Sequence, residues 1–372
     1  MSPGHVPTSR QVVFARKGVI ELSEQPVAEP APGDLLMRVK RVGICATDLH
    51  LLDGHIGDPF PLVPGHEFVG EVAEIGAAAA RDRGLAVGDR IVVEMLLPCG
   101  VCARCREGRY NLCDRDDPAG GYPVGREYGI NIPRTHESGL WGGYADILTV
   151  PATAIVHRLP QSIPWDVAAL VEPLAVAYRA VERGRVSPGD TVVVIGPGPV
   201  GLLIAAAARS AGASTVAMVG TRPSRLELAK RFGSDATVDS RESSDVASDV
   251  RAALGGVLAD VVIEIAGVAA AQRQAVTLVR RGGRVVLAGA CGGGVGVEFL
   301  ADEQLLTREI DLLPSFLSAG GYEPSIAALQ RNAFPYAELV THRFPLERVE
   351  EAYALVRGKA DNVMKAILVP NE

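Results

Sequence analysis

A glycine-rich loop between an apolar run and an alanine-rich segment most limits what this chain can fold into. The run 192–195 (VVVI) leads into 196–201 (GPGPVG), and 199–210 has the composition of a helix. In a strand–loop–helix unit, the spacing G-x-G-x-x-G permits a tight turn, close approach of backbone to a pyrophosphate, and close helix–strand packing. Free N–H groups at the helix start favour phosphate. The alternative is an ordinary glycine-rich turn. The predicted dinucleotide-binding residues are Gly196, Gly198, Pro199, Val200 and Gly201.

Strands and helices are expected to alternate around this loop. The expected strands are 191–195, 215–219, 260–265 and 284–288, and the expected helices are 168–181, 199–210, 223–232 and 269–279. Such alternation implies βαβ units and a parallel sheet. Residues 11–160 instead show short alternating runs such as 35–42, with frequent turn signals, which predict an all-β region; a strand at 365–369 closes the chain. The length of 372 residues suggests about two domains.

The end of the second strand bears on which dinucleotide is bound. NAD-binding units place Asp or Glu roughly 20 residues past the glycines, where it holds the ribose hydroxyls. Here Gly220, Thr221 and Arg222 stand at that tip, with Arg225 beyond. Gly220 leaves space, Thr221 can donate a hydrogen bond, and a guanidinium can pair with a 2′-phosphate. NADP is therefore the predicted coenzyme, and a solvated Arg222 in an enzyme that accepts NAD as well is the alternative.

Composition excludes several partners. The net charge of −7 argues against nucleic acid and against an anionic membrane surface. The longest uncharged run, 191–208, is broken by glycine and proline, so a strand, loop and helix explain it better than a membrane span. The first twenty residues lack an apolar h-region, which predicts no secretory signal.

Four of the six cysteines, Cys99, Cys102, Cys105 and Cys113, follow the pattern C-x2-C-x2-C-x7-C. Without an export signal, clustered cysteines usually hold metal, and four thiolates suit a closed, structural zinc site. A nucleic-acid zinc ribbon, an iron–sulfur cluster and unmetallated thiols are the alternatives. A cytoplasmic location follows. For Cys291, burial as a small apolar residue is the simplest expectation.

A second group of candidate metal ligands is scattered along the chain. It consists of Cys45 in 43–50 (GICATDLH), His66 and Glu67 in 64–70 (PGHEFVG), and Glu172 in 171–174 (VEPL). Any one of these residues would more often belong to a core than to a metal site. They are interpreted as metal ligands because they occur together with the cysteine cluster and the glycine loop, in this order.

Together these motifs resemble those of the zinc-containing medium-chain alcohol dehydrogenases, over about residues 10–370. The resemblance implies an α/β protein in which a Rossmann domain, residues 167–311, is inserted in an irregular, small-chaperonin-like β-barrel formed by 1–166 and 312–372. The zinc lobe would occupy about 95–117. Dimers or tetramers of identical chains, two zinc ions per chain and a small alcohol or carbonyl substrate are also implied.

The resemblance further assigns roles to individual residues. Cys45, His66 and Glu172 would bind the catalytic zinc, with Glu67 as an alternate ligand and Asp48 orienting the histidine. Thr47 would hydrogen-bond the substrate oxygen and His50 would pass its proton to solvent. Ala266, Ala288, Gly289 and Lys365 complete the expected coenzyme-binding set.

Glutamate at position 172 resembles the polyol and threonine dehydrogenase branch, as does the stretch 54–58. The Arg-Tyr pair of the polyol members is replaced after Phe316 by Leu317-Ser318, and Leu51 and Leu52 are expected beside the substrate. These features favour a less polar secondary alcohol or ketone. A polyol or amino-alcohol dehydrogenase using NAD is the alternative, followed by a zinc-independent quinone or enoyl reductase and a non-catalytic NADPH-binding protein.

Overall fold

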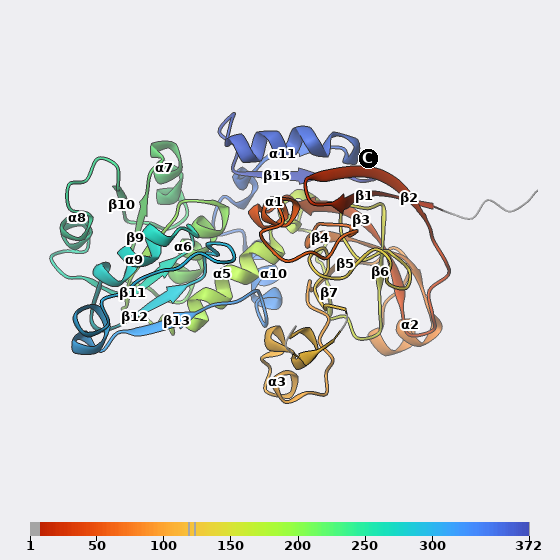
Figure 1. Ribbon diagram of the computed structural model, residues 1–372, viewed down its shortest axis with the longest axis horizontal. Coiled ribbons are helices and arrows are strands. Elements are labelled where there is room, and N and C mark those ends of the chain that lie inside the picture. Colours follow the sequence, from red (N-terminus) through yellow and green to blue (C-terminus); the bar gives the residue numbers. More distant parts are fainter. Residues whose placement is uncertain (1–7, 118–119, 123, 372) are drawn as a thin grey trace, which may run out of the picture. The chain divides into compact units, whose positions relative to one another are not determined.

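The computed structural model describes residues 8–117, 120–122 and 124–371 (Figure 1). The chain divides into two compact units. The first, called here the barrel unit, runs to Glu172 and takes up Ile326–Arg331 and the chain from Tyr336 onward. The second, the sheet unit, comprises Pro173–Ser325 and Asn332–Pro335. The sheet unit is thus inserted between segments of the barrel unit, as the sequence predicted for a Rossmann domain, although the predicted boundaries at 166/167 and 311/312 stay a prediction.

The barrel unit contains nearly all the antiparallel β-structure. A seven-stranded sheet has the order β14-β15-β3-β4-β5-β7, with β6 also paired to β3, and β1 and β2 form a separate antiparallel pair. The strands are β1 Thr8–Arg16, β2 Val19–Pro26, β3 Leu35–Gly43, β4 Glu67–Ile75, β5 Arg90–Val93, β6 Ile147–Val150, β7 Val156–Arg158, β14 Val340–Phe344 and β15 Lys365–Leu368. Its main helices are α1 Ala46–Leu52, α2 Ala77–Arg83, α3 Ala103–Arg106, α4 Trp165–Ala168 and α11 Val349–Gly358.

Strand β3 organises this unit because it pairs with three others. Its apolar side chains, among them Leu35, Met37 and Val39, are fully buried in the core. The antiparallel register with β4 sets Gly43 opposite Glu67 and Val39 opposite Gly70. The end of β3 therefore meets the start of β4, which brings two of the predicted metal-site motifs together.

The sheet unit is built on six parallel strands in the order β10-β9-β8-β11-β12-β13. The strands are β8 Thr191–Ile195, β9 Thr215–Gly220, β10 Ala236–Asp239, β11 Ala259–Glu264, β12 Val279–Leu287 and β13 Asp311–Pro314. The helices are α5 Val171–Arg183, α6 Pro199–Ser210, α7 Pro223–Arg231, α8 Val246–Ala253 and α9 Ala269–Leu278. Helix α10 Tyr322–Arg331 begins in this unit, and its residues from Ile326 onward belong to the barrel unit. Val192, Val193 and Val194 are fully buried, as expected for a central parallel strand covered on both faces. The predicted α/β class with a parallel Rossmann sheet is confirmed.

Most predicted elements of the sheet unit agree with the structure to within one residue. The helix expected at 168–181 is wrong in one respect, because α4 ends at Ala168 and α5 begins at Val171. The strand expected at 284–288 begins five residues earlier, at Val279, and strands β10 and β13 and helix α8 were missed. Polar residues surround β10 and α8, although Asp245 caps α8 by accepting hydrogen bonds from the N–H groups of Ala247 and Ser248.

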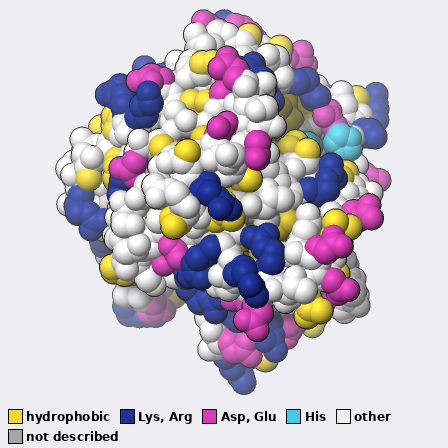
Figure 2. Space-filling model, turned by 90° about the vertical axis from the view of Figure 1, so that its left-hand side faces the viewer, with side chains coloured by type: hydrophobic (Ala, Val, Ile, Leu, Met, Phe, Trp, Pro, Cys, Tyr) yellow, Lys and Arg dark blue, Asp and Glu magenta, His cyan; other side chains and the backbone are white. Residues whose placement is uncertain are grey.

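In the part of the chain that the structure describes, no helix is both long enough and apolar enough to cross a bilayer. Figure 2 shows the side of the molecule on which α8 is labelled in Figure 1. Charged side chains of both signs lie on that face, and Lys and Arg gather toward its lower centre.

Candidate active site and zinc-binding lobe

The start of helix α1 fixes the position of Cys45. Cys45 is the N-cap of α1, and its backbone N–H donates to Oδ2 of Asp48 at 2.8 Å. This is the side-chain half of a capping box, in which a carboxylate three residues into the helix satisfies a free N–H group. The spacing Cys-x-x-Asp therefore holds the thiol at the helix end.

Asp48 also contacts two residues from other segments. Its Oδ2 accepts a hydrogen bond from the hydroxyl of Tyr144 at 2.9 Å, and its Oδ1 lies 3.4 Å from Nδ1 of His66. The carboxylate is fully buried. Burial alone would lower the pKa of His66, but the charge of Asp48 and the neighbouring Cys45 raise that pKa well above its usual range. A buried carboxylate on the ring nitrogen is the arrangement that orients a metal-binding histidine.

Two glycines in the motifs are required by close packing around this group. A Cβ at Gly43 would lie 1.8 Å from Oε2 of Glu67, and a Cβ at Gly65 would lie 2.2 Å from the ring of Tyr144. Gly65 also has a φ of +94°, which a residue with a side chain rarely adopts. Glycine at both positions lets Glu67 and Tyr144 approach the backbone.

The structure brings Cys45, His66 and Glu67 together. One ligand atom from each lies within 4.8 Å of the others, and the sulfur, nitrogen and oxygen donors are those that zinc prefers. Among the described residues, Glu172 is not part of this group, although it is buried at the start of α5 and contributes to the electrostatic environment of Lys365. Glu172 as the third ligand stays a prediction, and Glu67 is the carboxylate that the geometry favours.

Lys365, expected to contact the coenzyme, has another partner. Its ammonium forms an ion pair with Glu67, and the two side chains are 4% and 1% exposed. Burial would lower the pKa of Lys365, but Glu67, Cys45 and Glu172 raise it above its usual value. The cluster thus favours the charged form of Lys365 beside the proposed metal ligands.

Thr47 and His50 lie on α1 after Cys45. The hydroxyl of Thr47 is 3.5 Å from the sulfur of Cys45, which places it beside the ligand group. His50 is half-buried on the next turn of the helix, and its Nδ1 lies 3.4 Å from Nδ1 of the exposed His55. The contact with the exposed His55 places a second imidazole between His50 and the surface. This contact was not predicted.

The structure also brings the four clustered cysteines together, as predicted. The sulfurs of Cys99, Cys102, Cys105 and Cys113 lie within 4.8 Å of one another. The backbone N–H groups of Cys102 and Cys105 donate to the sulfurs of Cys99 and Cys102, both at 3.4 Å. Burial raises the pKa of Cys99, but the N–H groups of Val101 and Cys102 and the thiols of Cys102 and Cys113 lower it to about 6. The donor set fits a thiolate-bound structural zinc.

In the sheet unit, the glycine loop has the geometry that its spacing predicts. Gly196 has a φ of +115°, and a Cβ at Gly201 would lie 1.8 Å from the carbonyl oxygen of Gly196. At Gly198 a Cβ would meet no atom within 4 Å, so the backbone there is open to a ligand. Helix α6 starts with Gly198 as N-cap and Pro199 as its first residue, which leaves free N–H groups at the loop.

The end of β9 presents two guanidinium groups. Arg222 is the N-cap of α7, and Arg225 lies on its first turn. Burial lowers the pKa of Arg225, and so does the charge of Arg222, which shows that the two groups are close enough to repel. Gly220 is packed under Pro197, whose ring a Cβ would meet at 2.4 Å. The strand end therefore offers positive charge and no carboxylate.

The remaining predicted coenzyme residues lie on the loops after β11 and β12, which hydrogen-bond to each other. The N–H groups of Ala288 and Gly289 donate to the carbonyl of Glu264 at 2.9 and 3.0 Å, and Oε1 of Glu264 accepts the N–H of Gly267 at 2.9 Å. Ala266 is the exposed residue between them. These loops follow the carboxyl ends of β11 and β12, the edge at which parallel sheets bind ligands.

Comparisons with known proteins support the same assignment. The family model described as the alcohol dehydrogenase GroES-like domain matches residues 31–164, and the zinc-binding dehydrogenase model matches residues 199–331. An erythritol/L-threitol dehydrogenase of Mycolicibacterium smegmatis is 36% identical over 361 residues, which cover 94% of both chains. A sorbitol dehydrogenase of Bacillus subtilis is 32% identical, with 95% of this chain and 94% of that protein covered.

Among solved structures, a zinc-binding dehydrogenase of Sinorhizobium meliloti bound to NADP has a TM-score of 0.84 at 31% identity, with 98% of this chain and 100% of that chain covered. The chain belongs to the zinc-containing medium-chain dehydrogenases. Within that family it falls in the polyol dehydrogenase-like branch. This dehydrogenase is a zinc-dependent alcohol oxidoreductase that uses NAD(P).

Besides the contact with His55, sequence reasoning missed three features of the dehydrogenase. Tyr144 and the pairing of Lys365 with Glu67 depend on contacts between distant segments, for which the sequence carries no periodic signal. Glu264 could have been found, because a carboxylate that ends a buried parallel strand is unusual. Burial raises the pKa of Glu264 to about 7, although the N–H groups of Gly267 and Ala266 oppose the shift.

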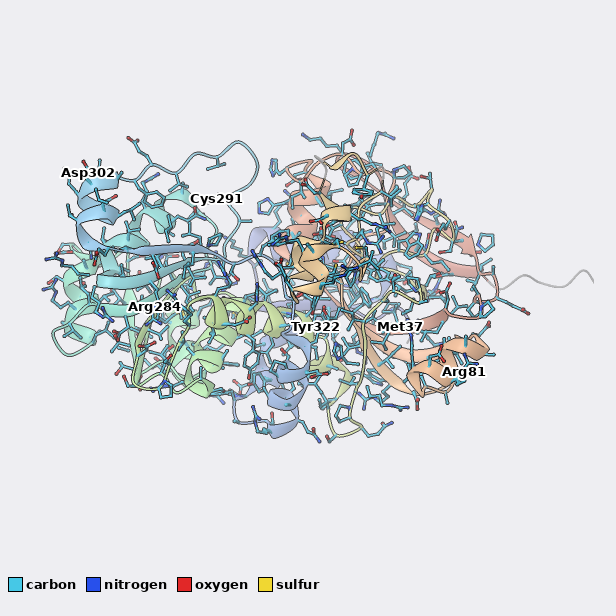
Figure 3. The ribbon with its side chains drawn as sticks, turned by 90° about the horizontal axis from the view of Figure 1, so that it is seen from below. Met37, Arg81, Arg284, Cys291, Asp302 and Tyr322 are labelled. Carbon is cyan, nitrogen blue, oxygen red and sulfur yellow. The ribbon has the colours of Figure 1, made fainter. Side chains whose placement is uncertain are left out.

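Cys291 lies on the loop that follows β12 in the dehydrogenase (Figure 3). Its side chain is half-buried rather than buried. Burial and the charge of Glu264 raise the pKa of its thiol. A raised pKa argues against a reactive thiolate, so a packing role remains the simplest expectation.

Proposed function

We propose that this dehydrogenase interconverts a secondary alcohol and the corresponding ketone at the group formed by Cys45, His66 and Glu67. That group carries the proposal, because a thiolate, an imidazole and a carboxylate within 4.8 Å of one another suit zinc. Zinc bound there would polarise the substrate oxygen, and a bound nicotinamide would accept or supply the hydride. Glu172 is retained as a proposed ligand, with Glu67 as the alternate supported by the geometry.

The chain's own residues would hold the substrate and move its proton. Thr47, 3.5 Å from the sulfur of Cys45, would hydrogen-bond the substrate oxygen and accept its proton. His50, with His55 beyond it, would carry that proton toward solvent. Asp48 would keep the ring of His66 in its ligating orientation, since it contacts Nδ1 and leaves Nε2 available.

The substrate class is narrowed by two observations. Leu51 and Leu52 belong to the hydrophobic core of the barrel unit, so their apolar character is explained by packing and no longer favours a less polar substrate. The similar proteins of M. smegmatis, B. subtilis and Agrobacterium fabrum are named for erythritol or threitol, sorbitol and altritol. A secondary hydroxyl group of a small polyol is therefore the substrate we favour over a simple secondary alcohol.

NADP is the proposed coenzyme. Arg222 and Arg225 supply positive charge where an NAD-binding protein would carry a carboxylate, and the similar S. meliloti structure holds NADP. A homodimer or homotetramer is also proposed. A cytoplasmic location is proposed as well, and it is consistent with the four free cysteines that are placed to hold metal.

Metal analysis and kinetics on three proteins test the proposal. The wild-type chain is expected to hold two zinc ions and to oxidise erythritol, threitol, sorbitol or altritol faster than butan-2-ol. His66→Ala should lose one zinc and at least 100-fold in kcat while still binding reduced coenzyme. Cys102→Ser, in the lobe, should lose the other zinc and mainly stability. Full turnover by His66→Ala would refute the proposed site.

A further inference from the structure

A largely solvent-open cavity of about 590 Å³ in the sheet unit lies away from the glycine loop, and Arg251, Arg280 and Arg281 on its lining are exposed. Leu258 immediately precedes β11, and Arg280 and Arg281 stand at the start of β12. Arg251 lies near the end of α8 and Arg308 on the turn before β13. The glycine loop follows the carboxyl end of β8, and the strands are parallel, so this cavity is at the opposite edge of the sheet. A ligand here would not occupy the coenzyme site.

Four arginines line this cavity, with no Asp or Glu among the lining residues. Asp260 is the one carboxylate that pairs with them among the described residues, through Nε of Arg280 at 2.6 Å. The site therefore carries about three uncompensated positive charges. Burial lowers the pKa of Arg308, and the charge of Arg281 lowers it further, as expected for cations gathered without counter-ions.

Part of this cluster has a structural explanation. Arg308 donates to the carbonyls of Val276 and Val279 at the end of α9, which caps that helix. Arg280 is committed to Asp260 and to the carbonyl of Arg281 at 2.8 Å.

The other two arginines are not explained in this way. Arg281 makes a single bond, to the carbonyl of Thr307 at 3.2 Å. Arg251 has no hydrogen-bond or ion-pair partner anywhere in the described chain. These two side chains keep most of their donors free.

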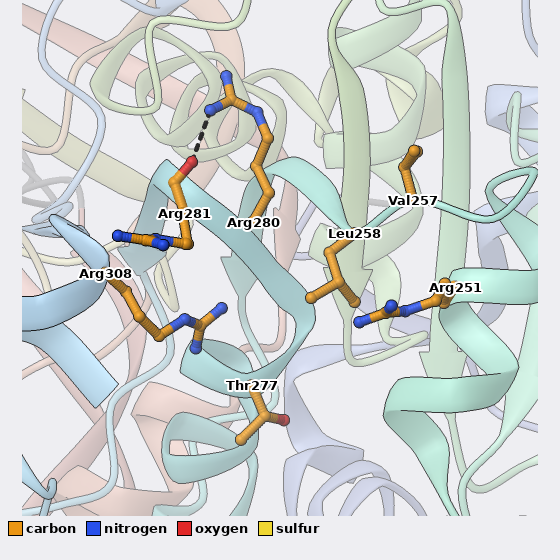
Figure 4. A pocket seen from close by; sticks show the side chains of 7 residues that line it. All are labelled: Arg251, Val257, Leu258, Thr277, Arg280, Arg281 and Arg308. Carbon is orange, nitrogen blue, oxygen red and sulfur yellow. Dashed lines mark hydrogen bonds between the residues drawn. The ribbon is translucent and has the colours of Figure 1, made fainter. Parts of the chain in front are cut away.

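The arrangement of the side chains indicates the shape of a ligand. In Figure 4, the guanidinium group of Arg251 lies on one side of the cavity and those of Arg281 and Arg308 lie on the other, whereas Arg280 turns away to its carbonyl partner. Leu258 stands between them, beside Val257, which is 54% exposed. A ligand that spans the cavity would have an anionic group at each end and a short carbon chain between.

We propose that this arginine cavity binds a small molecule that carries two phosphate groups joined by a short carbon skeleton. Each phosphate carries about −1.5 to −2 charges at neutral pH, so one group leaves the site positively charged, whereas two match it. Guanidinium groups bind phosphate through paired N–H donors, which suits arginines on two sides of a cavity.

Isothermal titration calorimetry with propylene bisphosphonate tests this site. The protein is loaded with zinc and saturated with its nicotinamide coenzyme, and ionic strength is held constant because phosphate binding is screened by salt. One molecule should bind per chain, at least tenfold more tightly than propylphosphonate, which has one anionic group. Arg251→Gln and Arg281→Gln should each weaken binding tenfold or more, and both variants should retain two zinc ions and coenzyme affinity.

Arg273→Gln is the matched control, since Arg273 is exposed on α9 but does not line the cavity. Its affinity for the probe should stay within twofold of the wild type. The proposal is overturned if the wild-type protein gives no binding, if Arg251→Gln binds as the wild type does, or if the two phosphonates bind equally. Tighter binding of an oligoglutamate peptide than of the bisphosphonate would also overturn it and would assign the surface to an acidic protein.

Discussion

The ammonium of Lys365 and the carboxylate of Glu67 form a buried ion pair beside Cys45 and His66. Breaking a buried pair from one side leaves an uncompensated charge and costs on the order of 3–5 kcal/mol. We therefore predict that Lys365→Met lowers the thermal midpoint of the zinc-depleted protein strongly. The loss should be smaller in the zinc-loaded protein, because a metal ion at the same group neutralises Glu67.

The double variant Glu67→Gln/Lys365→Met serves as the control for that experiment. It removes both charges together, so its midpoint should recover most of the loss when measured by differential scanning calorimetry. Equal losses with and without zinc, or no recovery in the double variant, would contradict the electrostatic explanation. A selective loss of coenzyme affinity in Lys365→Met would instead support the role first expected of this residue.

A second prediction concerns Gly43. Its Cβ would lie 1.8 Å from Oε2 of Glu67 and 2.9 Å from Cε of Lys365, so Gly43→Ala must displace both side chains. Overpacking of this kind costs about 1–3 kcal/mol. The variant should also lose zinc from the barrel site and at least tenfold in kcat. Zinc content by mass spectrometry and steady-state kinetics provide the measurement.

Gly358→Ala is the matched substitution, because a Cβ there meets no atom within 4 Å. It ends helix α11 and should leave zinc content and kcat unchanged. If Gly43→Ala retained both zinc ions and full activity, the close packing of Glu67 against β3 would have no functional consequence.

The sequence predicted the sheet unit well because its signals are local. The glycine loop, strand β8 and helix α6 each follow from residues adjacent in the chain, and their bounds agree with the structure. The barrel site was predicted only in part. Lys365 reaches Glu67 because β15, β3 and β4 are neighbours in one sheet. No periodicity in the sequence predicts that these three strands are neighbours. Lys365 was therefore identified as a site residue, but its pairing with Glu67 was not.

A third prediction uses the raised pKa of Glu264. Its pKa of about 7 in the folded protein lies above the ordinary value of 4.5, so the folded state binds the extra proton between these pH values. Stability from this group is then present below pH 4.5 and is lost as pH rises through 7, by on the order of 2–3 kcal/mol. Glu264→Gln should therefore raise the thermal midpoint of the coenzyme-free protein at pH 8 and change it little at pH 5.

The exposed Glu298 offers a comparison in the same unit. Glu298→Gln should shift the midpoint by a similar small amount at both pH values. A difference between wild type and Glu264→Gln that did not grow with pH would show that Glu264 is ionised in the folded protein at both values.

The final prediction separates the two coenzymes. Arg222 caps α7 at the end of β9, and a charge-assisted bond from its guanidinium to a 2′-phosphate would contribute about 1.5–3 kcal/mol. NADPH has this phosphate and NADH does not, so Arg222→Ala should weaken NADPH binding roughly 10- to 100-fold and NADH binding less than threefold. Fluorescence titration of both reduced coenzymes measures this directly. Arg231→Ala, at the far end of α7, is the control and should leave the ratio of the two dissociation constants unchanged. If Arg222→Ala weakened the binding of both coenzymes equally, Arg222 would support the fold of the strand end and would not contact the 2′-phosphate.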